Sequence, residues 1–456
     1  MMGKIKIEDR FQCKSVYSEI TGLITSILKI RKDAKTEDGY LYHYNILKDF
    51  EGLKLVLMNI MYEKTNIREV LKENKYHLNT HDLDKAFKGL DTKSEDPLYS
   101  RFFSNIEQLL EVKNYLFSYL FPLNLIFDDK NSTQLNEILE LFNIKKIETN
   151  DVKKILDKNI VKNRKKENKN ENSIDQRFIE LLKKNEPEKP DVLNYLKNYP
   201  TILLLKVEGK NSAYANNYAL YQMESFLGFL SFSENYLKEN LLSFGNFRGN
   251  SNYNEIKYDE VVIIGKNGIN WPKKDIIAKL LNENQRSKLI KFKSFEYLVN
   301  MYEDIKTIKN DFLWDLLKKS YFLYFKASSE ELVEYSFLNY WILAETLIKG
   351  DGKAKSNEEV KAIMKSVIGN DTLKKRIDFL DKKRNHLVHR GEIVTVEERD
   401  LIKIVADLLL AESMRIMGKL KNKKQFVYYL SNIKTSRKNR KNYIEVLKIL
   451  SEQDPQ

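Results

Sequence analysis

The sequence contains a single cysteine, Cys13, among its 456 residues. It cannot form a disulfide within this chain, which fits a reducing compartment, and a zinc site made of several cysteines is excluded. Long apolar runs are also missing, because the longest, residues 114–127, is interrupted by a serine, a proline and an asparagine. That run is too short to cross a bilayer, and residues 1–10 lack the apolar core of a signal peptide. We therefore expect a cytoplasmic protein with no membrane partner.

Acidic residues are outnumbered by basic ones, 65 to 78, which leaves a formal net charge of +13 at pH 7. An excess of positive charge favours polyanionic partners, because their counterions are released on binding. A lysine-rich composition produces the same excess without a functional reason, so charge alone does not identify nucleic acid as the partner. The hydrophobic content of 42% supports packed cores, and the length suggests two or three domains.

Helical spacing of apolar residues dominates the first third of the chain, with helices expected near 46–74 and 98–120. We interpret residues 1–157 as an all-helical N-terminal domain, a possible sensor or regulatory unit that can hold a partner or trigger. Residues 158–175 lose the apolar period and are rich in charge and asparagine. Such a composition is typical of a linker or an exposed loop, so we place a domain boundary there.

A mixed pattern follows in residues 176–325, which we interpret as an α/β connecting region. Compact apolar runs at 201–207 and 260–265 predict two strands around a helix at about 213–237. Helical spacing then returns and continues through a C-terminal domain, residues 326–456, which ends in a basic tail. The expected fold class is mainly α, with a small β-containing subregion in front of a C-terminal helical bundle.

Three successive helices are expected in the C-terminal domain. In the first, about 329–349, Glu345 lies within an apolar stripe. The second also places Arg384 on its inward face and ends at Gly391, a common C-terminal stop. The third, about 395–417, opens with a capping-box pattern.

The densest cluster of catalytic side-chain types is the segment DKKRNHLVHRGE, residues 381–392, which holds two of the five histidines. Cleaving RNA without a metal requires a base for the ribose 2′-hydroxyl, an acid for the leaving oxygen and cations for the charge on phosphorus. Histidine suits the first two roles and arginine suits the third.

Helix geometry limits how these residues can act together. Arg384 and His389 are five residues apart, about 140° around an ideal helix, so one chain does not direct both at the same phosphate. Asn385 and His389 are four apart and share a face. Two arrangements remove the mismatch: the last turn unwinds at Gly391, or a second copy of the motif faces the first across a dimer interface.

Arg384, Asn385 and His389 match the R-N-x-x-x-H form of the R-x(4 to 6)-H motif of the HEPN superfamily. With the upstream segment FLNYWILAETL and the capped helix that follows, the pattern resembles the HEPN domains of the bacterial ApeA-like group. The resemblance covers roughly residues 200–456 and is strongest over about 330–417. It implies a helical-bundle ribonuclease in which two HEPN domains pair into one composite site, without cofactors, leaving 2′,3′-cyclic phosphate ends.

The resemblance also implies a role for each motif residue. Arg384 and His389 are the expected catalytic pair, and Asn385 supports them. The implied setting is a homodimeric endoribonuclease in phage defence or a toxin, and single-stranded transfer RNA loops are a plausible target. The N-terminal domain carries no such resemblance, so the trigger and the RNA target stay open.

Neighbouring residues have more open interpretations. Glu345 either orients Arg384 or forms a structural ion pair with another base. Four residues flank the motif and can hold RNA, although helix-end residues of this kind are also ordinary protein surface. They are Lys382, Lys383, His386 and Arg390.

The main alternative is a non-catalytic RNA-binding or regulatory subunit that keeps the HEPN fold. The presence of both Arg384 and His389 favours the enzyme. Nucleotide transfer to a partner would need a carboxylate metal site, which we do not find, and His77 and His81 alone do not make one. Residues 419–441 combine basic and aromatic side chains, which suits either single-stranded RNA or a helix with its aromatics packed inward.

Overall fold

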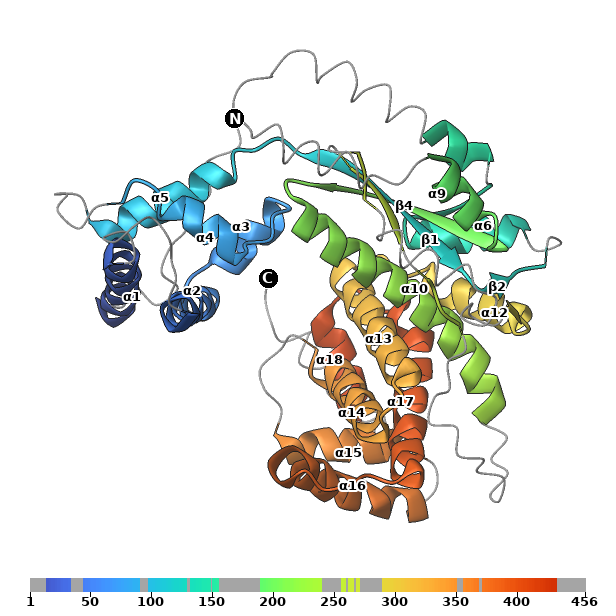
Figure 1. Cartoon of the computed structure of the whole chain (residues 1–456). Helices are drawn as coiled ribbons and strands as arrows, with labels where there is room; N and C mark the ends of the chain where they lie inside the picture. The colour runs from blue at the N-terminus through green and yellow to red at the C-terminus, as the bar shows by residue number, and fades with distance from the viewer. Residues whose placement is uncertain are drawn as a thin grey trace, which may run out of the picture.

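The computed structural model of the chain is mainly α-helical, with a small antiparallel sheet (Figure 1). No helix among the described residues has the length and apolarity needed to span a membrane. The structure describes residues 14–33, 44–90, 97–128, 132–148, 150–155, 189–239, 256–259, 261–265, 268–270, 289–350, 356–368 and 371–432. The expected linker at 158–175 and Cys13 lie outside these residues.

The N-terminal helices have a hydrophobic core of their own. Fully buried side chains from different helices meet there, including Ile20, Ile24, Met61 and Phe102. Ile20 and Ile24 are about one helical turn apart, which places both on the inward face of their helix. Figure 1 shows this group, in blue, beside the sheet and apart from the larger helical bundle. The helices are α1 (Lys14–Asp33), α2 (Tyr44–Lys64), α3 (Ile67–Glu73), α4 (Thr80–Ala86) and α5 (Leu98–Leu109).

The all-helical interpretation of residues 1–157 is wrong beyond α5. The helix expected at 98–120 ends at Leu109, and the apolar run after it is a strand, β1 (Tyr115–Leu123). Every residue of β1 from Phe117 onward is buried, because both faces of the sheet are covered. A strand buried on both faces carries no polar alternation and is easily taken for a helix. Further elements follow it: β2 (Leu125–Ile126), α6 (Ser132–Leu141) and β3 (Ile144–Ile147).

β1 is the central strand of the five-stranded sheet, whose order is β3-β4-β1-β5-β6. It pairs antiparallel with β4 (Thr201–Gly209) and β5 (Val262–Gly265), and β6 (Gly268–Asn270) completes that edge. The expected strands at 201–207 and 260–265 are thereby confirmed as β4 and β5. Because β1 and β3 pair with β4, strands from both sides of residue 157 share one sheet, and the expected boundary does not separate two domains.

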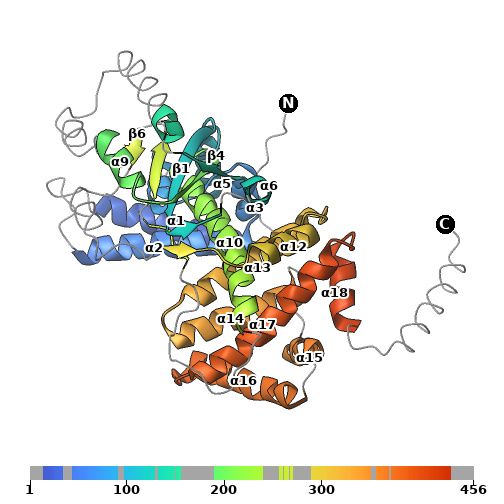
Figure 2. The same ribbon diagram turned by 90° about the vertical axis from the view of Figure 1, so that its right-hand side faces the viewer.

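Helices cover both faces of this sheet. One face packs against α9 (Lys189–Leu196), and the other joins the main core of the molecule along α10 (Ser212–Glu239). The helix expected at 213–237 is thus confirmed as α10. In both views α10 lies between the sheet and the other helices of the bundle (Figures 1 and 2). A Cβ atom at Gly228 would lie 1.8 Å from the carbonyl oxygen of Tyr321, so only glycine allows α10 to approach α13 this closely.

The bundle consists of α10, α13, α14 and α17, with shorter helices around them. Figures 1 and 2 place α15 and α16 at the end of the bundle farthest from the sheet. A short parallel pair of strands, β2 with β7 (Ile290–Lys291), adjoins the start of α12. The remaining helices are α12 (Phe295–Ile305), α13 (Asp311–Ser329), α14 (Val333–Lys349), α15 (Asn357–Val367), α16 (Asp371–Arg390), α17 (Val396–Met417) and α18 (Lys423–Asn432).

Polar contacts fix the N-terminal helices to the sheet just after β4. The amine of Lys210 donates to the carbonyl oxygen of Leu110 and, at 2.8 Å, to the side chain of Asn74. The side chain of Asn211 donates to the carbonyl oxygen of His77 at 2.7 Å. Burial at this junction lowers the pKa of Lys210. His77 therefore lies at a structural junction, while the side chain of His81 is outside the described residues.

Candidate functional site

The motif lies on the last two turns of α16, which is helical without interruption from Asp371 to Arg390. Gly391 ends the helix with a φ of +66°, a conformation that glycine adopts without strain, and its N–H donates to the carbonyl oxygen of Leu387 at 3.0 Å. The expected capping box at Thr395 is confirmed, since its hydroxyl and the Glu398 carboxylate each accept a hydrogen bond from the other's backbone N–H. The residues of the turn between α16 and α17 therefore form the hydrogen bonds that end α16 and begin α17.

The last turn of α16 is intact, so the structure does not have the unwound end that was one of the two expected arrangements. Unwinding at Gly391 would have brought Arg384 and His389 to the same side, but the helix keeps its geometry through Arg390. The two side chains are therefore about 140° apart, as on an ideal helix. Within this single chain, Arg384 lies against the bundle and His389 is exposed to solvent.

Arg384 lies among an acidic residue of its own helix and two residues of α14. Its guanidinium donates to Asp381 at 2.9 Å and lies 5.3 Å from the centre of the Trp341 ring. Its distance to the Glu345 carboxylate is 3.9 Å, so this contact is an ion pair and not a hydrogen bond. The Nε atom of Arg384 is buried and has no hydrogen-bond partner within the described part of the chain.

Glu345 links several groups and is not dedicated to Arg384. It accepts hydrogen bonds from the Trp341 indole at 2.9 Å and from Lys349 at 3.1 Å. The two interpretations of Glu345 thus describe one cluster: it forms a structural ion pair with Lys349 and also faces Arg384. Asp381, which is nearly buried, binds Arg384 more closely and lies 3.6 Å from the amine of Lys361 on α15.

His389 and Asn385 lie together on the outer part of α16. Neither side chain forms a hydrogen bond or an ion pair with any residue that the structure describes. His389 is exposed, and Asn385 is half-buried. Their spacing of four residues places them on one face, where both can contact the same ligand.

Lys383 is paired with acidic side chains, so it is less available for RNA than the exposed Lys382. The amine of Lys383 is mostly buried and donates to Glu392 at 2.8 Å, with Glu398 at 3.7 Å. Glu392 also contacts the Nδ1 atom of His386 at 2.8 Å. The hydrogen bond from Lys383 lowers the pKa of Glu392, and the same bond raises the pKa of Lys383. Lys383 and His386 therefore hold the turn after α16 in place, although His386 is still partly open to solvent.

Lys382 and Arg390 fit the expectation of a solvent-facing position. Both are exposed, and neither has a carboxylate within ion-pair distance in the described parts of the chain. Across those same residues, no group of three or more histidine, cysteine or acidic side chains is arranged to hold a metal ion.

The sequence of the basic tail, residues 419–441, is compatible with RNA binding and with a helix that packs its aromatics inward. Phe426 of α18 is fully buried, and the hydroxyl of Tyr429 bonds to Glu412 and Arg415 of α17. Only Tyr428 of these aromatics is well exposed. The described part of the tail, up to residue 432, thus packs its aromatics mainly inward, and residues 433–441 lie outside the described residues.

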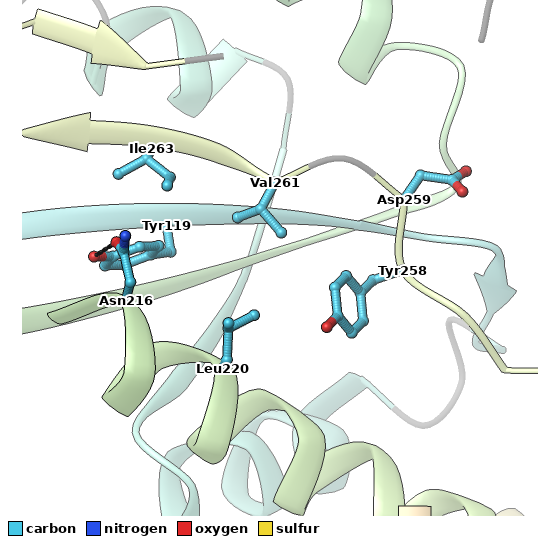
Figure 3. Close-up of a pocket in the computed structure, with 7 residues that line it drawn as sticks. All are labelled: Tyr119, Asn216, Leu220, Tyr258, Asp259, Val261 and Ile263. Atoms are coloured by element: carbon cyan, nitrogen blue, oxygen red, sulfur yellow. Dashed lines mark hydrogen bonds between the residues drawn. The ribbon is translucent and has the colours of Figure 1, made fainter. Parts of the chain in front are cut away.

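A cavity of about 490 Å³ lies between the sheet and α10, away from the motif (Figure 3). Tyr119 donates a hydrogen bond to the Asn216 side chain across it at 2.6 Å, and burial raises the pKa of Tyr119 and Tyr258. Among the described residues that line it, the acidic one is Asp259, which directs its carboxylate away from the other labelled side chains (Figure 3). With its phenols held protonated and no base aimed inward, this cavity is a weaker candidate for catalysis than α16.

Comparison of the chain with protein-family models, with curated proteins and with solved structures finds no match in any of the three. The site assignment therefore depends on the residues and on their geometry.

Sequence reasoning missed the closest partner of Arg384. Asp381 lies three residues before Arg384, a spacing that regularly produces ion pairs on a helix, so the signal was present. The link from Lys383 to Glu392 had no such signal, because it depends on the path of the chain after Gly391.

Proposed function

We propose that this protein is a metal-independent endoribonuclease of the HEPN type, acting on RNA such as transfer RNA in phage defence or as a toxin. The observation that supports it best is the arrangement of the motif on α16. His389 is exposed and Asn385 is half-buried, neither forms a hydrogen bond or an ion pair with the described residues, and Asp381 and Trp341 hold Arg384 on another side of the same helix. An available imidazole and a held guanidinium are the two groups that proton transfer next to a phosphate needs, provided that two chains bring them together.

The proposed reaction needs only side chains of these types. A base removes the proton of the ribose 2′-hydroxyl, whose oxygen attacks phosphorus while the bond to the 5′-oxygen breaks. An acid gives a proton to that leaving oxygen. The products are a 2′,3′-cyclic phosphate and a 5′-hydroxyl. His389 is the proposed proton-transfer group, Arg384 stabilises charge on the phosphate oxygens, and Asn385 orients the substrate.

A homodimer is part of the proposal because one chain keeps Arg384 and His389 on different sides of α16. Exposed apolar side chains on the two helices that hold the Arg384 cluster, and on the turn after α16, support it: Tyr335 and Ile342 of α14 are 56% and 45% exposed, and Val388 and Ile393 are 58% and 74% exposed. Isolated apolar side chains are normal on a surface, but a group of them suggests a contact surface. A two-fold axis beside it would bring each His389 toward the partner's motif.

One observation favours the alternative, a non-catalytic RNA-binding or regulatory subunit. The charge of Arg384 is already compensated by Asp381 and Glu345, as expected for a structural ion pair. The two functions differ in product formation, since a binding module leaves the RNA intact.

The test is cleavage of total RNA by the purified protein in excess EDTA, with mapping of the new ends. We expect 2′,3′-cyclic phosphate ends, and a loss of on the order of a hundredfold or more in His389→Ala. The melting temperature of His389→Ala should stay nearly unchanged, because the side chain is exposed and forms no hydrogen bond or ion pair with the described residues. His77→Ala is the matched control, since it removes an exposed histidine of the N-terminal part whose junction hydrogen bonds are made by its backbone, and it should keep its activity. Strict magnesium dependence with 3′-hydroxyl products, or undiminished cleavage by His389→Ala, would contradict the proposal.

A further inference from the structure

The solvent-facing side of α16 carries a stripe of cationic and aromatic residues that ends at His389. Lys375, Lys382 and His389 are seven residues apart, which turns each only about 20° from the last around the helix. All three are exposed. Phe379 and His386 fall between them at spacings of three and four, so the five residues form one continuous face about 21 Å long at 1.5 Å per residue. We call this face the outer stripe of α16.

The charge of the two lysines on the outer stripe is not compensated within the described structure, whereas His386 contacts the Glu392 carboxylate at 2.8 Å. Lys375 and Lys382 have no carboxylate within ion-pair distance there. The acidic residues beside the stripe are already occupied: Asp378 accepts two hydrogen bonds from Lys365, and Asp381 binds Arg384. The Lys365 hydrogen bonds lower the pKa of Asp378, so it stays ionised and bound to Lys365. The lysines of the stripe are therefore free for an anionic ligand.

Phe379 supplies a flat apolar surface in the middle of this charge. Its side chain is 42% exposed, unlike the buried phenylalanines of the core. The guanidinium of Arg376 lies 5.8 Å from its ring centre, which is within the range of a cation–π contact. An exposed aromatic ring between two free lysines is the combination that binds unpaired bases by stacking and their phosphates by charge.

We propose that the outer stripe of α16 is a binding track for single-stranded RNA that leads to His389. Phe379 stacks on an unpaired base, and Lys375 and Lys382 bind phosphates on either side of it. A duplex does not offer base faces to Phe379, so the track selects single strands or loops. The inference rests on the proposed function for what happens at His389, but binding along the stripe can be measured without cleavage.

The experiment measures binding of a fluorescent 2′-O-methyl single-stranded RNA oligonucleotide, which lacks the attacking hydroxyl and is not cleaved. Phe379→Ala should weaken binding about tenfold, since stacking on one base is worth about that much. Phe379→Tyr keeps a ring and should restore most of the affinity. Tyr17→Ala removes an aromatic of similar exposure on α1 and should bind like the wild type.

Salt dependence tests the lysines. Lys382→Gln should weaken binding and reduce the slope of log affinity against log salt by about 0.7, the value for one phosphate contact on a single strand. Lys145→Gln, a change at an exposed lysine of β3, should leave the slope unchanged. Equal affinity of Phe379→Ala and wild type, equal affinity for a duplex of the same sequence, or equally strong competition by a poly-glutamate peptide would each overturn the track.

The two proposals fail in different ways. A protein that binds the oligonucleotide with this pattern but never cleaves RNA keeps the track and refutes the ribonuclease. A protein that cleaves RNA with unchanged binding and unchanged kcat/KM in Phe379→Ala and Lys382→Gln keeps the ribonuclease and refutes the track.

Discussion

At the scale of single residues, the two central side chains of the motif have opposite surroundings. Arg384 contacts Asp381, Glu345 and Trp341, whereas His389 is exposed and forms no hydrogen bond or ion pair with the described residues. A side chain with several polar contacts contributes to folding as well as to any reaction, while an exposed one without them contributes little to folding. Replacing each residue should therefore separate stability from activity.

Arg384→Ala should abolish cleavage and also lower the free energy of unfolding by about 1–3 kcal/mol. The loss arises because Asp381, which is nearly buried, keeps only the amine of Lys361 at 3.6 Å as a cationic partner among the described residues. Exposure of about a fifth of the Arg384 side chain keeps the value below that of a fully buried pair. Urea denaturation measures the loss, with His389→Ala as the control that should unfold like the wild type. A stable and fully active Arg384→Ala protein would remove Arg384 from the site.

Sequence reasoning placed the motif on a helix but did not identify which of its bases are free. Inward and outward positions follow from helical spacing, so the burial of Arg384 against the bundle was foreseeable. Lys382 and Lys383 are adjacent and chemically alike, yet one is free and the other is bound to Glu392 across a turn. Contacts across a turn depend on backbone angles that the sequence does not state, so spacing alone did not indicate that Lys383 is bound to Glu392.

At the scale of elements, helices were predicted more reliably than the central strand. α10 and β4 were found because a long apolar period and a short apolar run ended by glycine are distinct signals. β1 was missed because tertiary packing, and not local pattern, makes it a strand: its partners β4 and β5 lie more than 75 residues further along the chain. The domain boundary was wrong for the same reason.

Gly391 offers a test of how α16 is ended. Its φ of +66° is costly for any residue with a Cβ, although a Cβ there would meet nothing within 4 Å. Gly391→Ala should therefore lower the free energy of unfolding by about 1 kcal/mol through backbone strain alone. Gly52→Ala, inside α2 and equally free of neighbours, should instead raise it by about 0.5–1 kcal/mol. Urea denaturation of both variants gives the two signs, and a Gly391→Ala protein as stable as the wild type would contradict the assigned strain.

At the scale of the whole molecule, the motif lies at the end of the bundle opposite the N-terminal helices (Figure 1). Between them the sheet packs on α10, α10 packs on α13, and α13 packs on α14, which carries Trp341 and Glu345. Among the described residues, this contiguous core connects the N-terminal helices to the motif and offers a route for a signal between them. The sequence alone did not reveal that route, because it depends on β1 and β4 joining segments that the sequence suggested were separate.

The separation of Arg384 and His389 around α16 predicts that two chains assemble to form each site. If each site takes Arg384 from one chain and His389 from its partner, a mixture of Arg384→Ala and His389→Ala chains restores one complete site in every mixed dimer. Random exchange makes half of the dimers mixed, with one of two sites intact, so recovery should approach about a quarter of wild-type activity.

The contact surface gives an independent test of the same dimer. Ile342→Glu places a charge among the exposed apolar residues of α14 and should shift the protein to monomers with loss of cleavage. Leu55→Glu, at an equally exposed position on α2, should leave both the sedimentation coefficient and the activity unchanged. A fully active wild-type monomer in sedimentation at assay concentration would refute the shared site, because no single α16 presents Arg384 and His389 to one phosphate.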